Sequence, residues 1–314
     1  MIKRLIRKDC NQLSIALLGF YAASWLGTLL IGILYSLAWS NSFIFELDVD
    51  SYYLLSGALS FLSLAVPFMF YLFLKKENPS KILQFQPVKF TTGFMYVIIG
   101  WGLCLASNLP VNFIYQYIDE TGINSGVTVQ PSADSTLSFI LKIIAVSIAP
   151  AVFEEFVFRG VVLSKLKKYG ASFAIVVSSI LFAILHSNLI SMPFAFLAGL
   201  VMGFIYVKTN NLWITIFIHF LNNAFSIVQE EILNYFTGEN AIIVFNVIFY
   251  AVIVFAFCFL AYLEYRDKIS SNLKNEIEFI GFKTKMFAAF TNPSTIAFVV
   301  LCISTLISNI VYYG

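Results

Sequence analysis

Long apolar stretches separated by short polar segments dominate this chain. A helix needs roughly 20 predominantly apolar residues to cross the hydrocarbon core of a bilayer. Nine runs approach or exceed this length: residues 13–39, 51–74, 92–118, 137–163, 172–186, 192–206, 212–228, 242–262 and 296–313. The fifth to seventh runs are the shortest. The pattern predicts an all-α, polytopic membrane bundle of about nine transmembrane helices, with eight as the alternative.

The composition also indicates a membrane protein. Hydrophobic residues fill 60% of the 314 positions and charged residues only 11%, whereas a soluble domain is about 45–50% apolar and about 25% charged. The 34 Phe and 16 Tyr are more large apolar side chains than one soluble core of this length could bury. These values exclude a disordered chain and a nucleic-acid-binding protein, and the four Cys provide no disulfide framework.

The basic residues predict the orientation of the bundle. Apart from Lys142 and Arg159, every Lys and Arg lies before the first run, after an even-numbered run up to the sixth, or before the last run. Cytoplasmic loops are enriched in Lys and Arg, so we expect a multi-pass cell-membrane protein with its N-terminus in the cytoplasm and Gly314 outside. The first run is too long for a signal-peptide core and lacks a clear cleavage site, so we expect a retained helix.

Few ionisable residues fall within the apolar runs. They are Lys142, Glu154, Glu155, Arg159, His186 and His219. A charge at the bilayer centre costs on the order of 3 kcal/mol, so such residues usually face a protein interior or a water-filled cavity and mark function. Lys142 lies near the outer end of its run, and we expect its long side chain to reach the lipid headgroups.

Glu155 and Arg159 are four residues apart, in the order that favours an ion pair on a helix. Adjacent helical residues point about 100° apart, which leaves Glu154 facing something else. Two interpretations follow. The three residues form a buried structural ion pair with a spare polar neighbour, or Glu154 is a proton-transfer group.

Glu154 and His186 are predicted to lie at the same depth. The fourth and fifth runs join in a tight basic turn, and each of the two residues lies 16 positions from the glycine of that turn, Gly170. At roughly 1.5 Å rise per residue, both lie about 24 Å from the tip of the hairpin. This match in depth favours the functional interpretation of Glu154.

The seventh run adds His219 and Asn223, which are four residues apart and project from one helix face. Alternatively, these side chains and Asn222 are hydrogen-bonding contacts between helices. On the sixth run, Gly199 and Gly203 form a pair of small residues at the same spacing, and we expect it to act in helix packing only.

Together, three motifs in this region resemble those of the CPBP intramembrane proteases, the bacterial Abi and type II CAAX prenyl endopeptidase group. They are E-E-x-x-x-R, F-x-x-x-H and H-x-x-x-N, carried by Glu154, Glu155 and Arg159, by Phe182 and His186, and by His219 and Asn223. The resemblance covers about residues 137–228. It predicts a four-helix catalytic core there, with the active site inside this core bundle, between an N-terminal three-helix membrane region (1–136) and a C-terminal two-helix membrane region (229–314).

The resemblance implies an enzyme that hydrolyses a peptide bond inside the membrane. Glu154 and His186 would activate the attacking water. His219 and Asn223 would form the oxyanion hole, in which losing one donor typically costs about 100- to 1000-fold in kcat. The implied partners are the bilayer and a membrane-embedded or lipid-anchored substrate, either a prenylated CAAX-type protein or a bacteriocin or other peptide precursor.

The metal requirement stays open at this point. Glu154, His186 and His219 are residue types that could hold Zn²⁺ with one open position, as in a metalloendopeptidase, yet the H-E-x-x-H motif is absent. Because the spacing requires no cofactor, we expect a glutamate-dependent, metal-free mechanism. Glu155, paired with Arg159, then supports the site without taking part in the chemistry.

Other protease classes fit the sequence less well. An intramembrane aspartyl protease needs two Asp residues within the membrane, and every Asp here lies in a predicted loop or tail. The G-x-S-x-G motif of serine hydrolases is absent. Two non-proteolytic alternatives stay open: a membrane binding or immunity protein whose polar cluster holds a partner, and a proton-coupled transporter that uses the cluster as a relay.

Overall fold

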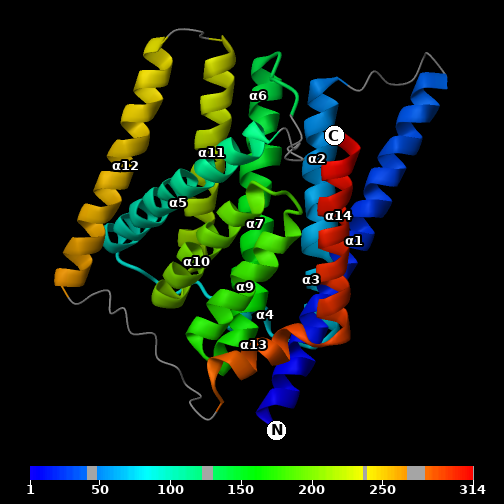
Figure 1. The fold of residues 1–314 in the computed structure, drawn as a ribbon, viewed down its shortest axis with the longest axis vertical. Coiled ribbons are helices and arrows are strands. Elements are labelled where there is room, and N and C mark those ends of the chain that lie inside the picture. The colour runs from blue at the N-terminus through cyan, green and yellow to red at the C-terminus, as the bar shows by residue number, and fades with distance from the viewer. Residues whose placement is uncertain (41–47, 122–129, 236–238, 267–279, 314) are drawn as a thin grey trace.

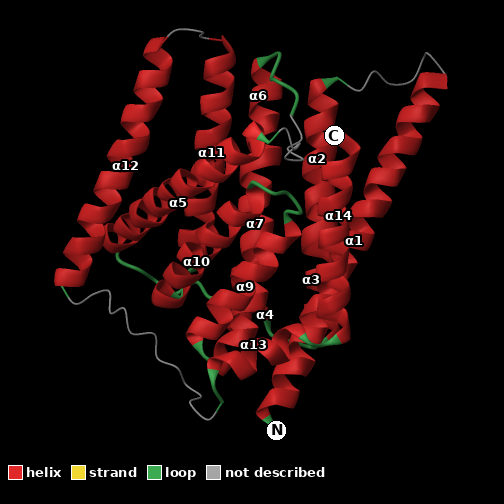
Figure 2. Cartoon of the chain, viewed as in Figure 1, coloured by secondary structure: helices red, strands yellow, loops and turns green. Residues whose placement is uncertain are grey.

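The computed structural model describes residues 1–40, 48–121, 130–235, 239–266 and 280–313. These residues form a bundle of helices whose long members run mostly along the long axis of the molecule (Figure 1). Coloured by secondary structure, the described chain consists of helices joined by loops, without strands (Figure 2). The prediction of an all-α polytopic membrane bundle is confirmed.

The helices follow the order of the predicted runs, and some of them contain π-helical or 3-10 segments, marked η, that continue the neighbouring α-helix. In chain order they are α1 (Ile2–Ser40), α2 (Val49–Ser60), η1 (Phe61–Ala65), α3 (Val66–Leu74), α4 (Pro79–Ile82), α5 (Phe90–Glu120), α6 (Thr136–Lys142), η2 (Ile143–Ile148), α7 (Ala149–Glu155), η3 (Phe156–Leu163), α8 (Ser164–Leu166), η4 (Lys167–Tyr169), α9 (Ala171–Leu185), α10 (Ser191–Thr209), α11 (Leu212–Tyr235), α12 (Glu239–Tyr265), α13 (Phe282–Phe290) and α14 (Pro293–Tyr313).

Eight stretches of the described chain are long and apolar enough to cross a membrane, and each matches one of the nine predicted runs. The remaining run is α9, which is apolar but has only 15 residues. A helix of that length spans about 22 Å at 1.5 Å per residue, less than the roughly 30 Å hydrocarbon core. The alternative count of eight therefore applies to full-length spans, and α9 ends partway along the bundle.

The fourth predicted run and α9 form the expected hairpin. Its turn is centred on Gly170, whose φ of 122° is a backbone conformation that residues with a side chain rarely adopt. Helix α10 then packs along α9 at Gly199 and Gly203. A Cβ on Gly199 would lie 3.1 Å from the Cα of Ser179, so a larger residue would force the helices apart. The packing role expected of the two glycines is confirmed.

Helices outside this core enclose it from two sides. The first helix, α1, packs against α13 and α14, so the first and last helices of the chain lie side by side (Figure 1). On the other side, α5 packs against α10, α11 and α12. The division into regions 1–136, 137–228 and 229–314 stays a prediction, and the helices of the first and last regions contact each other directly.

The expectation for Lys142 is wrong, because its side chain does not extend to the lipid headgroups. It is only 1% exposed, and its Nζ lies 2.6 Å from Glu231 Oε1 and 3.3 Å from Glu230 Oε1. Nζ also donates a hydrogen bond to the carbonyl of Pro131. Two carboxylates on α11 thus neutralise the ammonium group where it is, and a buried charge with such partners gains little by reaching for the interface.

Candidate active site

A cavity of about 490 Å³ lies between α5, α7, α9, α10 and α11. Its wall includes Glu154, His186, His219 and Asn223, the four residues predicted from sequence as catalytic. Helix α7 supplies the glutamate, the end of α9 supplies the first histidine, and α11 supplies the other two side chains. The structure therefore brings residues from three separate helices to one hollow inside the bundle.

Glu155 and Arg159 lie behind this wall, fully buried, with exposed fractions of 0% and 1%. Arg159 Nη1 donates to Glu155 Oε1 at 2.7 Å, which is the predicted ion pair. His219 Nδ1 lies 3.1 Å from the same carboxylate oxygen. Because an ion-paired carboxylate can only accept, His219 Nδ1 must carry the hydrogen of this bond.

The other ring nitrogen of His219 faces the cavity residue Glu154. Its Nε2 lies 3.7 Å from Glu154 Oε2, close enough for an ion pair and longer than a good hydrogen bond. With Nδ1 committed to Glu155, Nε2 can donate to a third group only when the ring is doubly protonated. His219 thus links the buried pair to the carboxylate in the cavity.

His186 has a defined orientation as well. Its Nδ1 lies 2.9 Å from the backbone carbonyl of Phe182, one helical turn earlier. A carbonyl oxygen only accepts, so Nδ1 carries a hydrogen, and in a neutral ring Nε2 then keeps its lone pair. Within the described residues, His186 shares the cavity wall with Glu154 without a direct hydrogen bond between the two side chains. Both side chains therefore line the same cavity.

Phe182 joins the parts of the site, a role that sequence analysis did not assign to it. The guanidinium carbon of Arg159 lies 4.8 Å from the centre of its ring, within the range of a cation–π contact. The same ring packs edge-on against His186, with centroids 4.8 Å apart. Arg159 Nη2 also donates to the carbonyl of Gly199 at 3.4 Å. The motif spacing between Phe182 and His186, one helical turn, was the only sequence signal for this arrangement.

Asn223 lies on the cavity wall beside the fourth-run helix. Its Nδ2 donates a long hydrogen bond, 3.4 Å, to the carbonyl of Val146, and its Oδ1 accepts from Asn222. Val146 belongs to η2, a π-helical segment, and a second one, η3, follows Glu155 directly. Such segments are frequent at functional sites because they re-aim side chains within a helix. One hydrogen on the Asn223 amide is left for a ligand in the cavity.

The cavity extends toward one end of the bundle. From the level of Glu154 and His219 its wall continues along α11 through Ser226 to Glu230, whose side chain is 43% exposed. Gln130, just before α6, lies at the same end. This is the end at which the sequence places acidic, Lys- and Arg-free connections. The cavity thus leads from the four predicted residues to the acidic end of the molecule.

Metal ligands are not grouped within the part of the chain that the structure describes. No set of three or more His, Cys, Asp or Glu side chains there is placed to hold a metal ion. Glu154, His186 and His219 therefore do not form the three-ligand arrangement that a zinc site needs. The cofactor requirement of the reaction stays a prediction.

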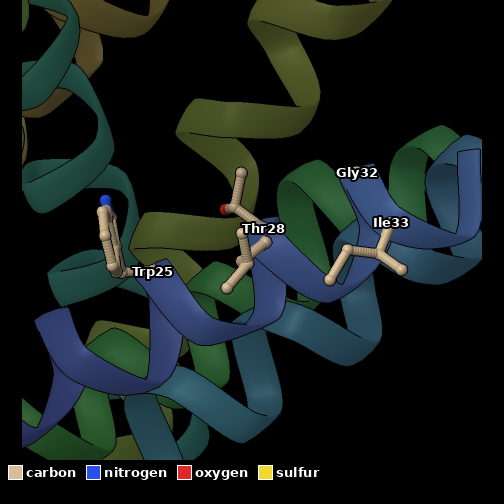
Figure 3. Close-up of a pocket in the computed structure, with 5 residues that line it drawn as sticks. Trp25, Thr28, Gly32 and Ile33 are labelled. Carbon is tan, nitrogen blue, oxygen red and sulfur yellow. The ribbon is translucent and has the colours of Figure 1, made fainter. Parts of the chain in front are cut away.

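A second hollow, on α1, differs in character from this cavity. It is lined by Trp25, Thr28, Leu29, Gly32 and Ile33, all from one helix (Figure 3). Apart from the threonine hydroxyl and the indole N–H of Trp25, its side-chain atoms are apolar, and several of these side chains are exposed at the surface of the bundle. Such a surface is what a lipid-facing helix presents.

The fold and the site together define a class: a multi-pass membrane protein with a carboxylate, two imidazoles and an amide on one internal cavity. Residues 136–225 match the family described as type II CAAX prenyl endopeptidase Rce1-like. The matched segment contains all three motifs, so the resemblance to the CPBP family is confirmed.

Two curated relatives are similar to this chain. The putative membrane peptidase YdiL of Bacillus subtilis is 29% identical over 149 residues, which is 46% of this chain and 61% of the relative. The membrane-embedded CAAX protease MroQ of Staphylococcus aureus is 28% identical over 170 residues, 50% of this chain and 66% of the relative. The chain thus covers less than two thirds of either relative. No solved structure matches it.

Proposed function

We propose that this chain is an intramembrane endopeptidase that hydrolyses a peptide bond of a membrane-associated substrate. The observation that carries the proposal is the meeting of Glu154, His186, His219 and Asn223 on one cavity, in the segment that matches a prenyl endopeptidase family. Both relatives are named as membrane peptidases or proteases. A carboxylate, an imidazole with a free lone pair and two donors are the parts that hydrolysis by an activated water requires.

The proposed reaction begins with a water held between Glu154 and His186. The lone pair of His186 Nε2 accepts a hydrogen bond from the water and orients it. Glu154 removes a proton as the water oxygen attacks the carbonyl carbon of the substrate. Glu154 then gives this proton to the leaving nitrogen, the C–N bond breaks, and a new carboxyl end and a new amino end are released.

The oxyanion formed by the attack needs hydrogen-bond donors. Asn223 supplies one through its free amide hydrogen. His219 supplies the second through Nε2–H, which requires the doubly protonated ring, because Nδ1 donates to Glu155. With His219 as an imidazolium, the charges of Glu154, Glu155, Arg159 and His219 sum to zero. Such a neutral set of charges is the least costly one to hold within a membrane.

We further propose that the reaction is metal-free. The steps above use only side chains of this chain, and the described His and Glu residues are not grouped as a three-ligand zinc site. Metal analysis of the purified, active protein tests this. One equivalent of bound zinc that is needed for cleavage would contradict the metal-free mechanism.

The direction of the cavity bears on the substrate class. It leads from Glu154 to Glu230 at the acidic end of the bundle, which the positive-inside rule assigns to the outer face of the membrane. We therefore favour a peptide precursor whose cleaved segment reaches the site from the outer face over a prenylated tail held at the cytoplasmic leaflet. Labelling of Ser226→Cys in intact cells by a membrane-impermeant maleimide is expected, with Lys208→Cys as the control at the opposite end.

The proposal is tested by comparing peptide and protein termini in membranes that carry either the wild-type chain or Glu154→Gln at equal expression. A terminus that appears only with the wild type would identify the substrate and the bond that is cut. Identical termini in both membranes, together with a Glu154→Gln chain that keeps its biological effect, would favour the binding, immunity or transport alternatives.

A further inference from the structure

We propose that Tyr21 on α1 and Asn309 on α14 are positioning residues that hold the His186 turn in its active geometry. Neither helix belongs to the segment 136–225 that matches the endopeptidase family. The inference rests on the proposed function, because it assigns to the two terminal helices a role in the chemistry of His186.

The turn that follows α9 has an unusual backbone. His186 ends the helix, and the next residue, Ser187, has a φ of 46°. This left-handed conformation is rare for a residue other than glycine, and it is kept only where surrounding contacts hold it. Ser187 is also buried. Its neighbours must therefore supply the contacts that fix the turn.

Those contacts come from helices far away in the sequence. The hydroxyl of Tyr21 lies 2.8 Å from Ser187 Oγ and also donates to Cys302 Sγ at 3.3 Å. Asn309 Nδ2 donates to the backbone carbonyl of Ser187 at 3.3 Å. Ser187 is thus bound through its side chain by Tyr21 of α1 and through its backbone carbonyl by Asn309 of α14. These hydrogen bonds are possible because α14 packs against both α1 and α9 (Figure 1).

Local hydrogen bonds of Asn188 fix the remainder of the same turn. The side chain of Asn188 is buried, and its Oδ1 accepts hydrogen bonds from the backbone amides of Ile190 and Ser191 at 2.9 and 3.0 Å. This connects the turn to the start of α10, where Ser191 lines the cavity. His186 therefore lies between α9 and a turn whose backbone is fixed by hydrogen bonds.

These contacts to Ser187 are important because α9 is short. Its last carbonyl groups end partway along the bundle, where an unpaired polar backbone group would face an apolar environment and lose its partner from water. Asn309 satisfies the carbonyl of Ser187 in the turn that follows α9. A shift of the turn would also rotate the ring of His186, moving Nε2 away from the water it orients. A misplacement of about 1 Å in a catalytic group can cost on the order of 100-fold in rate.

The test uses three variants of the full-length chain in lipid vesicles. Tyr21→Phe removes the hydroxyl, Asn309→Leu has a similar size and removes the donor without adding a charge, and Asn309→Gln keeps the donor. Tyr250→Phe is the matched control, because this tyrosine is exposed on α12. For each variant kcat, KM, the pH profile of kcat/KM and the thermal midpoint are measured on the substrate found by terminus mapping.

We expect kcat to fall about tenfold in Tyr21→Phe and Asn309→Leu, with KM and the thermal midpoint close to wild type. The pH profile of kcat/KM should shift, and Asn309→Gln should recover most of the activity. Wild-type kcat in Tyr21→Phe and Asn309→Leu, or losses that follow the thermal midpoint with an unchanged pH profile, would overturn the inference. A wild-type chain without cleavage would instead refute the proposed function.

Discussion

The substitution Glu155→Gln tests whether the charge of the buried Glu155–Arg159 pair contributes to the reaction in the cavity. Glu155 Oε1 accepts from both Arg159 Nη1 at 2.7 Å and His219 Nδ1 at 3.1 Å, and it is completely buried. A glutamine oxygen can still accept both hydrogen bonds, so the shape of the site changes little. The substitution removes the negative charge that balances the guanidinium and the proposed imidazolium.

The magnitude of this change follows from the distances. At an effective dielectric constant of about 20, opposite charges 3.1 Å apart attract by about 5 kcal/mol. Removing one partner of a buried ion pair typically costs about 3–5 kcal/mol of stability. Removing this attraction weakens the support for the Nε2–H donor that the proposed oxyanion hole takes from His219. The expected loss of kcat is about 100- to 1000-fold.

The adjacent substitution Glu154→Gln is the matched control. Glu154 lies on the cavity wall and is partly exposed, so its replacement should abolish cleavage while leaving the thermal midpoint close to wild type. Glu155→Gln should lower both cleavage and the thermal midpoint. Cleavage is measured by mass spectrometry of the products, and the thermal midpoint by loss of helical circular dichroism. Both measurements use purified protein in vesicles. Cleavage by Glu155→Gln within tenfold of wild type at an unchanged midpoint would refute this reasoning.

Three further predictions concern stability and metal. Lys142→Met should cost about 3–5 kcal/mol by leaving Glu231 buried without a counter-charge, and adding Glu231→Gln should restore most of it in thermal unfolding. Gly199→Val should destabilise the protein by about 1–3 kcal/mol, because the new side chain meets the backbone of Ser179, whereas a wild-type midpoint would show that α9 and α10 can separate without cost. Chelation of zinc by phenanthroline should leave the cleavage rate unchanged, and restoration of a lost rate by added Zn²⁺ would contradict the metal-free proposal.

The sequence predicted the helices and the depth of the site residues well, because both depend on local spacing. Each of the nine apolar runs is helical, and Glu154 and His186 reach one cavity, as their equal distances from Gly170 indicated. The Glu155–Arg159 pair also formed as expected from its spacing of one turn. Periodicity and rise per residue are sufficient for such statements.

Lateral neighbours could not be predicted in the same way. Lys142 and Glu231 are 89 residues apart, and Tyr21 and Ser187 are 166 apart. Such pairs depend on which helices pack together and on how each helix is rotated, which the spacing of apolar residues does not fix in a chain that is apolar on every face. The bond between His219 and Glu155 was missed for the same reason.

The central claim is that Glu154 activates the water that hydrolyses a peptide bond within the membrane. Its most direct test is single-turnover cleavage by the purified chain in lipid vesicles, wild type against Glu154→Gln, using the substrate found by terminus mapping. We predict product from the wild type and none from Glu154→Gln, with both chains showing the same thermal midpoint. Cleavage by Glu154→Gln at the wild-type rate would contradict the claim.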